Sequence, residues 1–130
     1  QFEVQRGLPI QMLMKYFEQI GCEWQIKSEL RQRIRWQNLN LQEDFRHLGA
    51  FDIVFCRNVL IYFENELKRD ILERAHSQMR SDGYLVLGAA ETVIGITDSF
   101  DRLNNCESSV YQPRATMPST LSKSLRTRTR

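Results

Sequence analysis

The first part of the chain shows helical spacing of its apolar side chains. Pro9 suits the first turn of a helix, and Gly21 follows the last apolar position. The apolar residues between them recur every three or four positions: Ile10, Leu13, Met14, Phe17 and Ile20. This spacing predicts a helix over residues 9–20, with one apolar stripe that packs against the protein.

Residues 22–41 have strand-like spacing instead. Trp24 and Ile26, and then Ile34 and Trp36, flank the charged stretch 27–33. This alternation predicts a small antiparallel hairpin formed by the two pairs. Aromatic residues in such a pattern are typical of packing, so no chemistry is assigned to the two tryptophans.

The most distinctive apolar run lies in the middle of the chain, at residues 51–63. Residues 53–56 lack polar alternation, which predicts a strand of a parallel sheet that is covered on both faces. Arg57 and Asn58 follow directly, and α/β sheets bind ligands beyond the carboxyl ends of their strands. A guanidinium and an amide suit the carboxylate, hydroxyl or adenine edges of a small molecule. The alternative is a helix-capping asparagine beside a surface arginine.

A second helix is predicted after this strand. Asn65 is placed to cap its start, and Gly83 lies near its expected end. One apolar stripe consists of Leu67, Ile71, Leu72, Ala75 and Met79, and the opposite face is charged. The stripe predicts packing of this helix against a sheet.

Two further strands follow the second helix. Residues 84–87 are an apolar run after a predicted turn at 81–83, and Val110 and Tyr111 are a candidate last strand. The order strand, helix, strand predicts a parallel pair with a right-handed crossover, and therefore the α/β class.

Composition limits the remaining possibilities. The 130 residues suffice for one core, and 42% hydrophobic with 26% charged residues is ordinary for a globular domain. No apolar run reaches the roughly 20 residues that span a bilayer, and the start shows no signal-peptide pattern. We therefore expect a cytoplasmic protein without membrane insertion, and the start without Met suggests a fragment of a longer chain.

Cysteines and histidines give no sign of a metal site. The three cysteines are far apart and form no CxxC or Cys/His cluster, which predicts reduced thiols. His47 and His76 have no metal-like neighbours, so we expect ordinary packing or surface histidines and no metal.

Charge separates the end of the chain from the rest. Residues 1–107 hold 13 basic and 16 acidic residues, whereas residues 108–130 hold five basic and no acidic ones. Few apolar groups and no periodicity predict a disordered basic tail at 113–130. Such a tail attracts anionic partners without specificity, so the favoured interpretation is a solvated linker, and no nucleic-acid binding is expected.

Several segments together resemble a known family, the CheR-type chemotaxis receptor methyltransferases. They are the run FCRNVLIYF at 55–63, the strand 83–88 with Glu91 shortly beyond, and the opening stretch 3–9. The resemblance covers roughly residues 2–112. It implies a doubly wound, Rossmann-like fold that uses S-adenosylmethionine, of which residues 1–112 are the C-terminal part. It also implies methyl transfer to glutamate side chains on the cytoplasmic helices of chemoreceptors, with S-adenosylhomocysteine as the product.

The resemblance also implies cofactor-binding residues. Arg57 and Asn58 match the family's Arg-Asn cofactor contacts. Asn40 and Leu41 match its Asn-Leu pair, which contacts the cofactor from the preceding strand end. The alternative for Asn40 is a turn residue whose side chain bonds to its own backbone.

Two further residues match the family, with different consequences. Tyr62 matches a tyrosine near the transferred methyl group and is the candidate catalytic residue. Alternatively, its ring packs between sheet and helix with the hydroxyl exposed. Glu91 matches a family glutamate to which no role is assigned here, and taken alone it reads as a charge that caps a loop.

The family's first sheet half, with its glycine-rich cofactor turn, is not visible before residue 51. We therefore expect an exposed sheet edge, weak activity or none from the chain alone, and possible pairing with another copy through that edge. One alternative is an inactive methyltransferase-like module that binds a partner in a signalling protein. Another is a different nucleotide enzyme of the same fold, which would need a dinucleotide fingerprint that the sequence does not show.

Overall fold

The chain folds into two compact units. The structure, a computed structural model, describes residues 7–105 and 109–115. The first unit extends to Asn38, and the second begins at Leu39. Most of the predicted basic tail, from residue 116 onwards, lies outside the described residues.

From Ile10 onwards, the first unit contains two short helices and a two-stranded sheet. Helix α2 spans Ile10–Tyr16, strand β1 spans Phe17–Ile20, strand β2 spans Glu23–Ile26 and helix α3 spans Ser28–Arg31. The two strands pair antiparallel, with Phe17 opposite Ile26 and Ile20 opposite Glu23. Gly21 adopts a φ of +62° in the two-residue connection, a conformation that suits glycine in a tight hairpin.

The antiparallel hairpin is present, but with other strands than predicted. The helix predicted over 9–20 stops at Tyr16, because the backbone of residues 17–20 pairs with β2. Residues 34 and 36 have no regular structure, and the side chain of Trp36 is 74% exposed. A run of only four residues is too short for its apolar spacing to exclude a strand, and the tight turn at Gly21 favours the strand.

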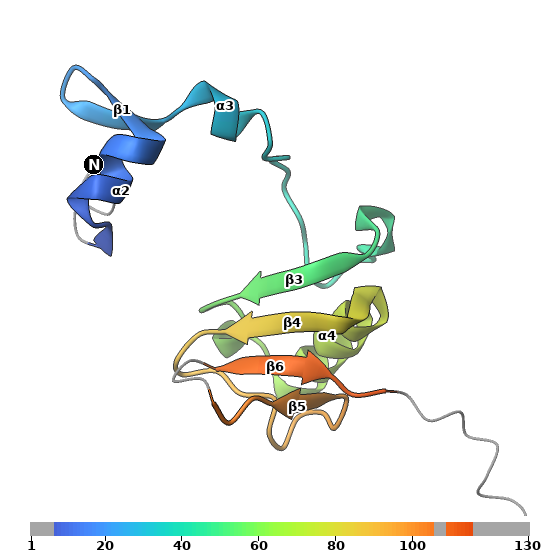
Figure 1. Ribbon diagram of the computed structural model, residues 1–130. Helices are drawn as coiled ribbons and strands as arrows, with labels where there is room; N and C mark the ends of the chain where they lie inside the picture. Colours follow the sequence, from blue (N-terminus) through green and yellow to red (C-terminus); the bar gives the residue numbers. More distant parts are fainter. Residues whose placement is uncertain (1–6, 106–108, 116–130) are drawn as a thin grey trace, which may run out of the picture. The chain divides into compact units, whose positions relative to one another are not determined.

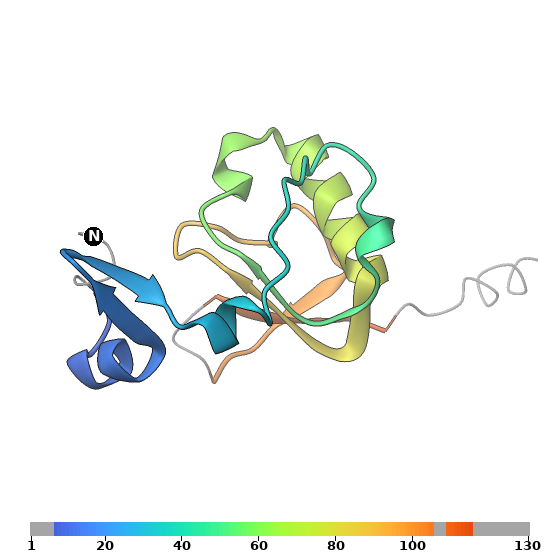
Figure 2. The same ribbon diagram turned by 90° about the horizontal axis from the view of Figure 1, so that it is seen from above.

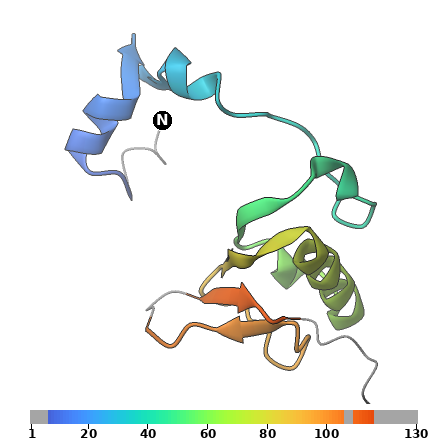
Figure 3. The same cartoon turned by 45° about the vertical axis from the view of Figure 1, so that its right-hand side comes forward.

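A four-stranded mixed sheet forms the centre of the second unit (Figure 1). Its strands are β3 (Phe51–Cys56), β4 (Met79–Leu87), β5 (Phe100–Arg102) and β6 (Val110–Pro113), in the spatial order β3-β4-β6-β5. Strands β3 and β4 are parallel, as predicted, and β6 is antiparallel to both of its neighbours. The unit is therefore mixed α/β. Figure 3 shows β5 and β6 side by side at the sheet edge away from β3.

Helix α4, Asn65–Gln78, connects the two parallel strands and lies on one face of the sheet (Figure 2). Its Ile71 and Leu72 are buried with Leu85 and Leu87 of β4 in the main apolar core. Two 3-10 helices flank β3, η1 at Arg46–Leu48 and η2 at Leu60–Tyr62. The predicted apolar stripe thus packs on the sheet, as expected.

The boundaries of α4 differ from the prediction at both ends. Glu64 occupies the capping position, so Asn65 is the first helical residue and not the cap. The helix ends at Gln78, and residues 79–83 already belong to β4. A Cβ at Gly83 would lie 2.7 Å from the carbonyl oxygen of Asp52, so this glycine allows close approach of the two strands at a bulge and does not end the helix.

Strand β3 is an edge strand with one uncovered face. Among the described residues, β3 pairs only with β4. Its Val54 and Cys56 pack against the core, whereas Ile53 and Phe55 point the other way and are 52% and 71% exposed. The prediction that residues 53–56 are covered on both faces is therefore wrong for the described part of the chain, because α4 covers only one face.

Candidate functional site

The turn after β3 presents two of the predicted site residues. Arg57 and Asn58 follow the carboxyl end of the strand, and both are exposed. Asn58 has a φ of 59°, in the left-handed region, where asparagine is tolerated better than most residues. Val59 returns to a helical conformation and leads into η2. Both residues are thus accessible at this turn, and the side-chain oxygen of Asn58 lies close to Gly88.

A single carboxylate, that of Glu91, holds this turn. One of its oxygens accepts hydrogen bonds from the backbone N–H groups of Asn58 and Gly88, each at 2.7 Å. Its other oxygen accepts bonds from the N–H groups of Val59 at 2.9 Å and Leu60 at 2.7 Å. Glu91 is only 6% exposed. A buried charge needs hydrogen-bond partners, and four backbone N–H groups that follow the ends of β3 and β4 supply them. This geometry agrees with the interpretation of Glu91 as a loop-capping charge.

Gly88 allows this approach. A Cβ at position 88 would lie 2.5 Å from the side-chain oxygen of Asn58 and 2.7 Å from a carboxylate oxygen of Glu91. Both distances are shorter than a nonbonded contact allows. A glycine is therefore needed where the end of β4 passes the turn after β3.

The environment of Glu91 changes the acidity of two groups. Burial raises the pKa of Glu91, but the four backbone N–H groups outweigh it and leave this pKa below its ordinary value. The thiol of Cys56, at the end of β3, has its pKa raised to about 11 by burial and by the negative charge of Glu91. At neutral pH, Glu91 is therefore an anion and Cys56 a neutral thiol.

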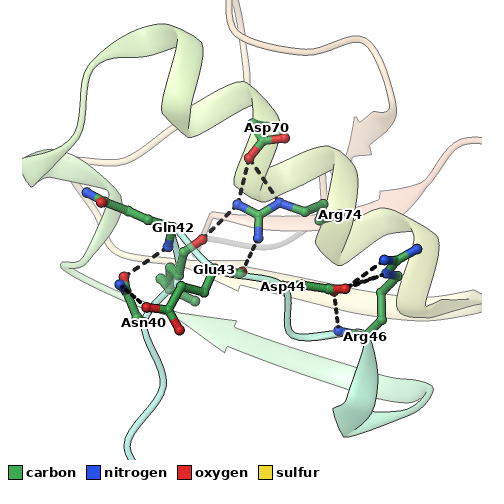
Figure 4. A network of polar contacts seen from close by, with 8 residues as sticks. Asn40, Gln42, Glu43, Asp44, Arg46, Asp70 and Arg74 are labelled. Atoms are coloured by element: carbon green, nitrogen blue, oxygen red, sulfur yellow. Dashed lines mark hydrogen bonds and ion pairs between the residues drawn. The ribbon is translucent and has the colours of Figure 1, made fainter.

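The predicted pair Asn40 and Leu41 lies in the segment that precedes β3. The side-chain oxygen of Asn40 accepts the N–H of Gln42 at 3.1 Å, and its amide donates to Glu43 at 3.1 Å (Figure 4). Asn40 thus has the geometry of a turn residue, the alternative to cofactor contact, and the residue is exposed.

Arg74 of α4 fastens this segment to the helix. Its guanidinium donates to the carbonyl oxygen of Leu41 at 2.7 Å and to that of Glu43, and it pairs with Asp70 one turn earlier at 2.6 Å (Figure 4). The guanidinium carbon also lies 4.8 Å from the centre of the Phe45 ring. The planar group satisfies two carbonyls and an anion at once, which a lysine cannot do in this geometry.

An apolar groove of about 340 Å³ lies beside β3. Leu41, Cys56 and Val59 all contribute to its lining, so the structure brings the segment at 39–41 and the end of β3 to the same groove. Asn40, Arg57 and Asn58 do not line it, although each adjoins a residue that does. Further lining residues come from η1, from α4 and from the whole length of β3: Leu48, Ile71, Leu72, Ala75, Gln78, Phe51, Ile53, Val54 and Phe55.

Tyr62 stands apart from this arrangement. It is the last residue of η2, and its side chain is 80% exposed. This exposure contradicts the alternative in which the ring packs between sheet and helix. Tyr62 also does not line the apolar groove.

The sequence predicted the exposed residues of the site but not the residues that hold them in place. Glu91 was noted, but nothing in the sequence indicated that its carboxylate crosses to residues 58–60. Gly88 and Arg74 were not singled out.

Two further findings concern metals and membranes. In residues 7–105 and 109–115, no cluster of three or more histidine, cysteine or acidic residues is arranged to hold a metal ion. Within the same ranges, none of the helices combines the length and the apolar character that crossing a bilayer requires.

Comparison with known proteins gives a consistent result. Residues 1–109 match a family model described as the CheR methyltransferase, SAM binding domain. A chemotaxis protein methyltransferase of Pseudomonas putida is 41% identical over 112 residues, which are 85% of this chain and 41% of that protein. Another, from Pseudomonas aeruginosa, is 41% identical over 84% of this chain and 40% of its own length. A third, from Vibrio cholerae, is 35% identical over 82% of this chain and 39% of its own length. The chain therefore spans about two fifths of the length of these relatives.

Proposed function

Because the chain belongs to the CheR methyltransferase family and matches its SAM-binding domain, we propose that it is part of an enzyme that methylates glutamate side chains of chemoreceptors. The cofactor of this domain is S-adenosylmethionine. The observation that carries the proposal is the family match together with a polar turn at the carboxyl end of β3, beside an apolar groove that runs along this strand. The relatives are themselves named as chemotaxis protein methyltransferases.

The described residues suit such a cofactor. S-adenosylmethionine combines an apolar purine with ribose hydroxyls, an amino group and a carboxylate. The groove offers apolar contact through Leu41 and Val59, and exposed polar groups of Arg57 and Asn58 adjoin it. A guanidinium and an amide are suitable partners for carboxylate and hydroxyl groups. We therefore assign cofactor binding to Asn40, Leu41, Arg57 and Asn58.

The transfer itself makes few demands on titratable side chains. When bound, the cofactor supplies a methyl group on a positively charged sulfur. A glutamate acceptor has an ordinary pKa of about 4.3, so it is already ionised at pH 7 and needs no general base. The protein accelerates such a reaction chiefly by alignment and by exclusion of water. The exposed hydroxyl of Tyr62 is free to orient the acceptor carboxylate, and we propose it as the catalytic contact.

The four-stranded sheet corresponds to only part of a complete catalytic domain. The parallel pair β3–β4, joined by α4, with antiparallel β6 and β5 beyond, fits one half of a doubly wound sheet. The free edge of β3 and the exposed Ile53 and Phe55 leave room for further strands and helices. We propose that residues 1–112 are the C-terminal part of the catalytic domain and that 113–130 is a basic tail. Without the rest of the domain, this edge is a site for pairing with another copy.

The proposed substrate defines the partners and the location. The acceptor glutamates lie on cytoplasmic helices of methyl-accepting chemoreceptors, so we propose a cytoplasmic location and receptor helices as partners. One observation favours a second candidate, an inactive module: Tyr62, the proposed catalytic contact, lies outside the groove. In that case the cofactor binds, but no methyl group is transferred.

The test uses the full protein that its gene encodes. Calorimetric titration with S-adenosylhomocysteine measures cofactor-site binding, with Asn58→Ala as the site variant. Transfer of labelled methyl from S-adenosylmethionine to a purified receptor signalling fragment measures activity, and base-labile label identifies a glutamate ester. Binding with transfer supports the enzyme. Binding without transfer supports the inactive module, and no binding overturns both.

A further inference from the structure

We propose that Glu91 is a positioning residue for methyl transfer, which acts by fixing the backbone of the cofactor-binding turn at Asn58. The inference rests on the proposed function, because it presumes that Arg57 and Asn58 contact the cofactor. Glu91 itself is 6% exposed, so its role is exerted through the turn and not by contact with the acceptor.

The backbone at Asn58 needs support from its surroundings. Asn58 has a φ of 59°, a left-handed conformation that most residues with a side chain rarely adopt. Three consecutive N–H groups, those of residues 58–60, point inwards from this turn and have no carbonyl partner in a regular element. A turn of this shape persists only when its surroundings hold it in place.

The carboxylate of Glu91 supplies that support. Its two oxygens take up all three N–H groups, together with the N–H of Gly88. The residue also donates its own N–H to the Gly88 carbonyl oxygen at 3.0 Å, which fixes it at the end of β4. The directions of Arg57 and Asn58 are therefore set by a carboxylate that belongs to the neighbouring strand. An amide in its place presents an NH₂ group to two of the donors and cannot reproduce the arrangement.

Glu73 of α4 provides a matched control. It is a partly buried carboxylate that accepts hydrogen bonds from the hydroxyls of Thr97 and Ser99, with the Ser99 contacts at 2.8 Å. Its removal costs stability through lost hydrogen bonds, as removal of Glu91 does. Glu73 bonds to residues 97–99 and not to the turn at 57–60, so only Glu91 should affect cofactor binding.

The experiment compares Glu91→Gln, Glu91→Asp and Glu73→Gln in the full protein that its gene encodes. S-adenosylhomocysteine affinity is measured by calorimetry well below each melting temperature, and amide hydrogen exchange is followed at residues 58–60. We expect Glu91→Gln to weaken binding about tenfold or more, the scale of a lost charge-assisted hydrogen bond, and to speed exchange at all three amides. Glu73→Gln should change the affinity less than about twofold.

The shorter Glu91→Asp variant covers the case in which Glu91→Gln does not fold. Its carboxylate keeps the charge but cannot reach all four donors, so we expect weaker binding than in the unmodified protein. Unchanged affinity in a folded Glu91 variant, or a loss no larger than that of Glu73→Gln, overturns the inference while the proposed function stands. If the unmodified protein does not bind S-adenosylhomocysteine, the proposed function fails and the inference fails with it.

Discussion

The carboxylate of Glu91 accepts the backbone N–H of Asn58 at 2.7 Å across 33 residues of sequence. This bond joins the turn after β3 to the end of β4, the two adjacent parallel strands of the sheet. Ligands of such sheets bind beyond the carboxyl ends of parallel strands. The bond thus lies where the family's cofactor is expected, and it makes the shape of the site depend on a residue that faces inwards.

Asn58→Gly and Asn58→Ala should separate the backbone role of this residue from its side-chain role. Glycine adopts the φ of 59° without strain, whereas alanine costs about 1 kcal/mol there. We expect both variants to lose S-adenosylhomocysteine affinity to a similar extent, because both lack the amide. Only Asn58→Ala should lower the free energy of unfolding. Urea unfolding and calorimetric titration measure the two effects, and retained affinity in Asn58→Gly would remove the side chain from the site.

Gly88→Ala should disturb the site through its Cβ. The added carbon meets the Asn58 side-chain oxygen at 2.5 Å and the Glu91 carboxylate at 2.7 Å, so one of these groups must move. We expect a loss of about 1–3 kcal/mol in the free energy of unfolding, together with weaker cofactor binding. Gly7→Ala is the control, since a Cβ there has no neighbour within 4 Å. Equal stability of the two variants would contradict the close approach at Gly88.

Arg74→Lys should loosen the segment that carries Asn40 and Leu41. Lysine keeps the positive charge. Its ammonium group cannot, at the same time, donate to both carbonyl oxygens, pair with Asp70 and lie over the Phe45 ring. We expect a loss of about 1–2 kcal/mol in the free energy of unfolding, measured by urea denaturation. Arg80→Lys is the control: its ion pair with Asp52 is 3.3 Å long and exposed, so we expect a change within about 0.5 kcal/mol. A similar small change at both positions would contradict the role of Arg74.

The sequence predicted the second unit better than the first for a physical reason. The parallel strands β3 and β4 and the stripe of α4 each carry a long apolar pattern that leads to one core. The first unit has elements of only four to seven residues, so its spacing does not separate helix from strand, and the turn at Gly21 decides. Gly83 was misread because a close strand approach and a helix end both call for glycine.

The candidate site was predictable only in part. The placement of Arg57 and Asn58 follows from the strand pattern, because they come directly after an apolar strand, whereas Tyr62 rests on the family resemblance and lies outside the groove. The bonds from Glu91 to Asn58 and from Arg74 to Leu41 join residues about thirty positions apart, and spacing carries no information on such pairs. Likewise, the exposed face of β3 at Phe55 was not foreseen, since apolar composition does not show which faces are covered.

Cys56 should be unreactive towards iodoacetamide, and Glu91 should contribute to that. Burial and the charge of Glu91 raise its pKa to about 11, so very little thiolate is present at pH 8. We expect slower alkylation than at the exposed Cys22, measured for each peptide by mass spectrometry. Glu91→Gln removes the charge and should speed the reaction at Cys56 but not at Cys22. An unchanged Cys56 rate in a folded variant would show that burial alone suppresses the thiolate.

The stabilising effect of Glu91 should depend on pH in a defined direction. Its pKa in the folded protein lies below the ordinary value of 4.5, because four backbone N–H groups outweigh the effect of burial. The carboxylate therefore contributes its full stabilisation above pH 4.5. As the pH falls below 4.5, the unfolded chain binds the proton first, and the contribution disappears as the pH passes the folded pKa.

Urea unfolding of the unmodified protein and of Glu91→Gln between pH 7 and pH 3 measures this dependence. Other carboxylates titrate in both proteins, so the difference between their free energies of unfolding isolates Glu91. We expect a constant difference above about pH 5 that shrinks steadily at lower pH. A difference that stays constant down to pH 3, or grows, would show that the four N–H groups do not favour the charged form of Glu91.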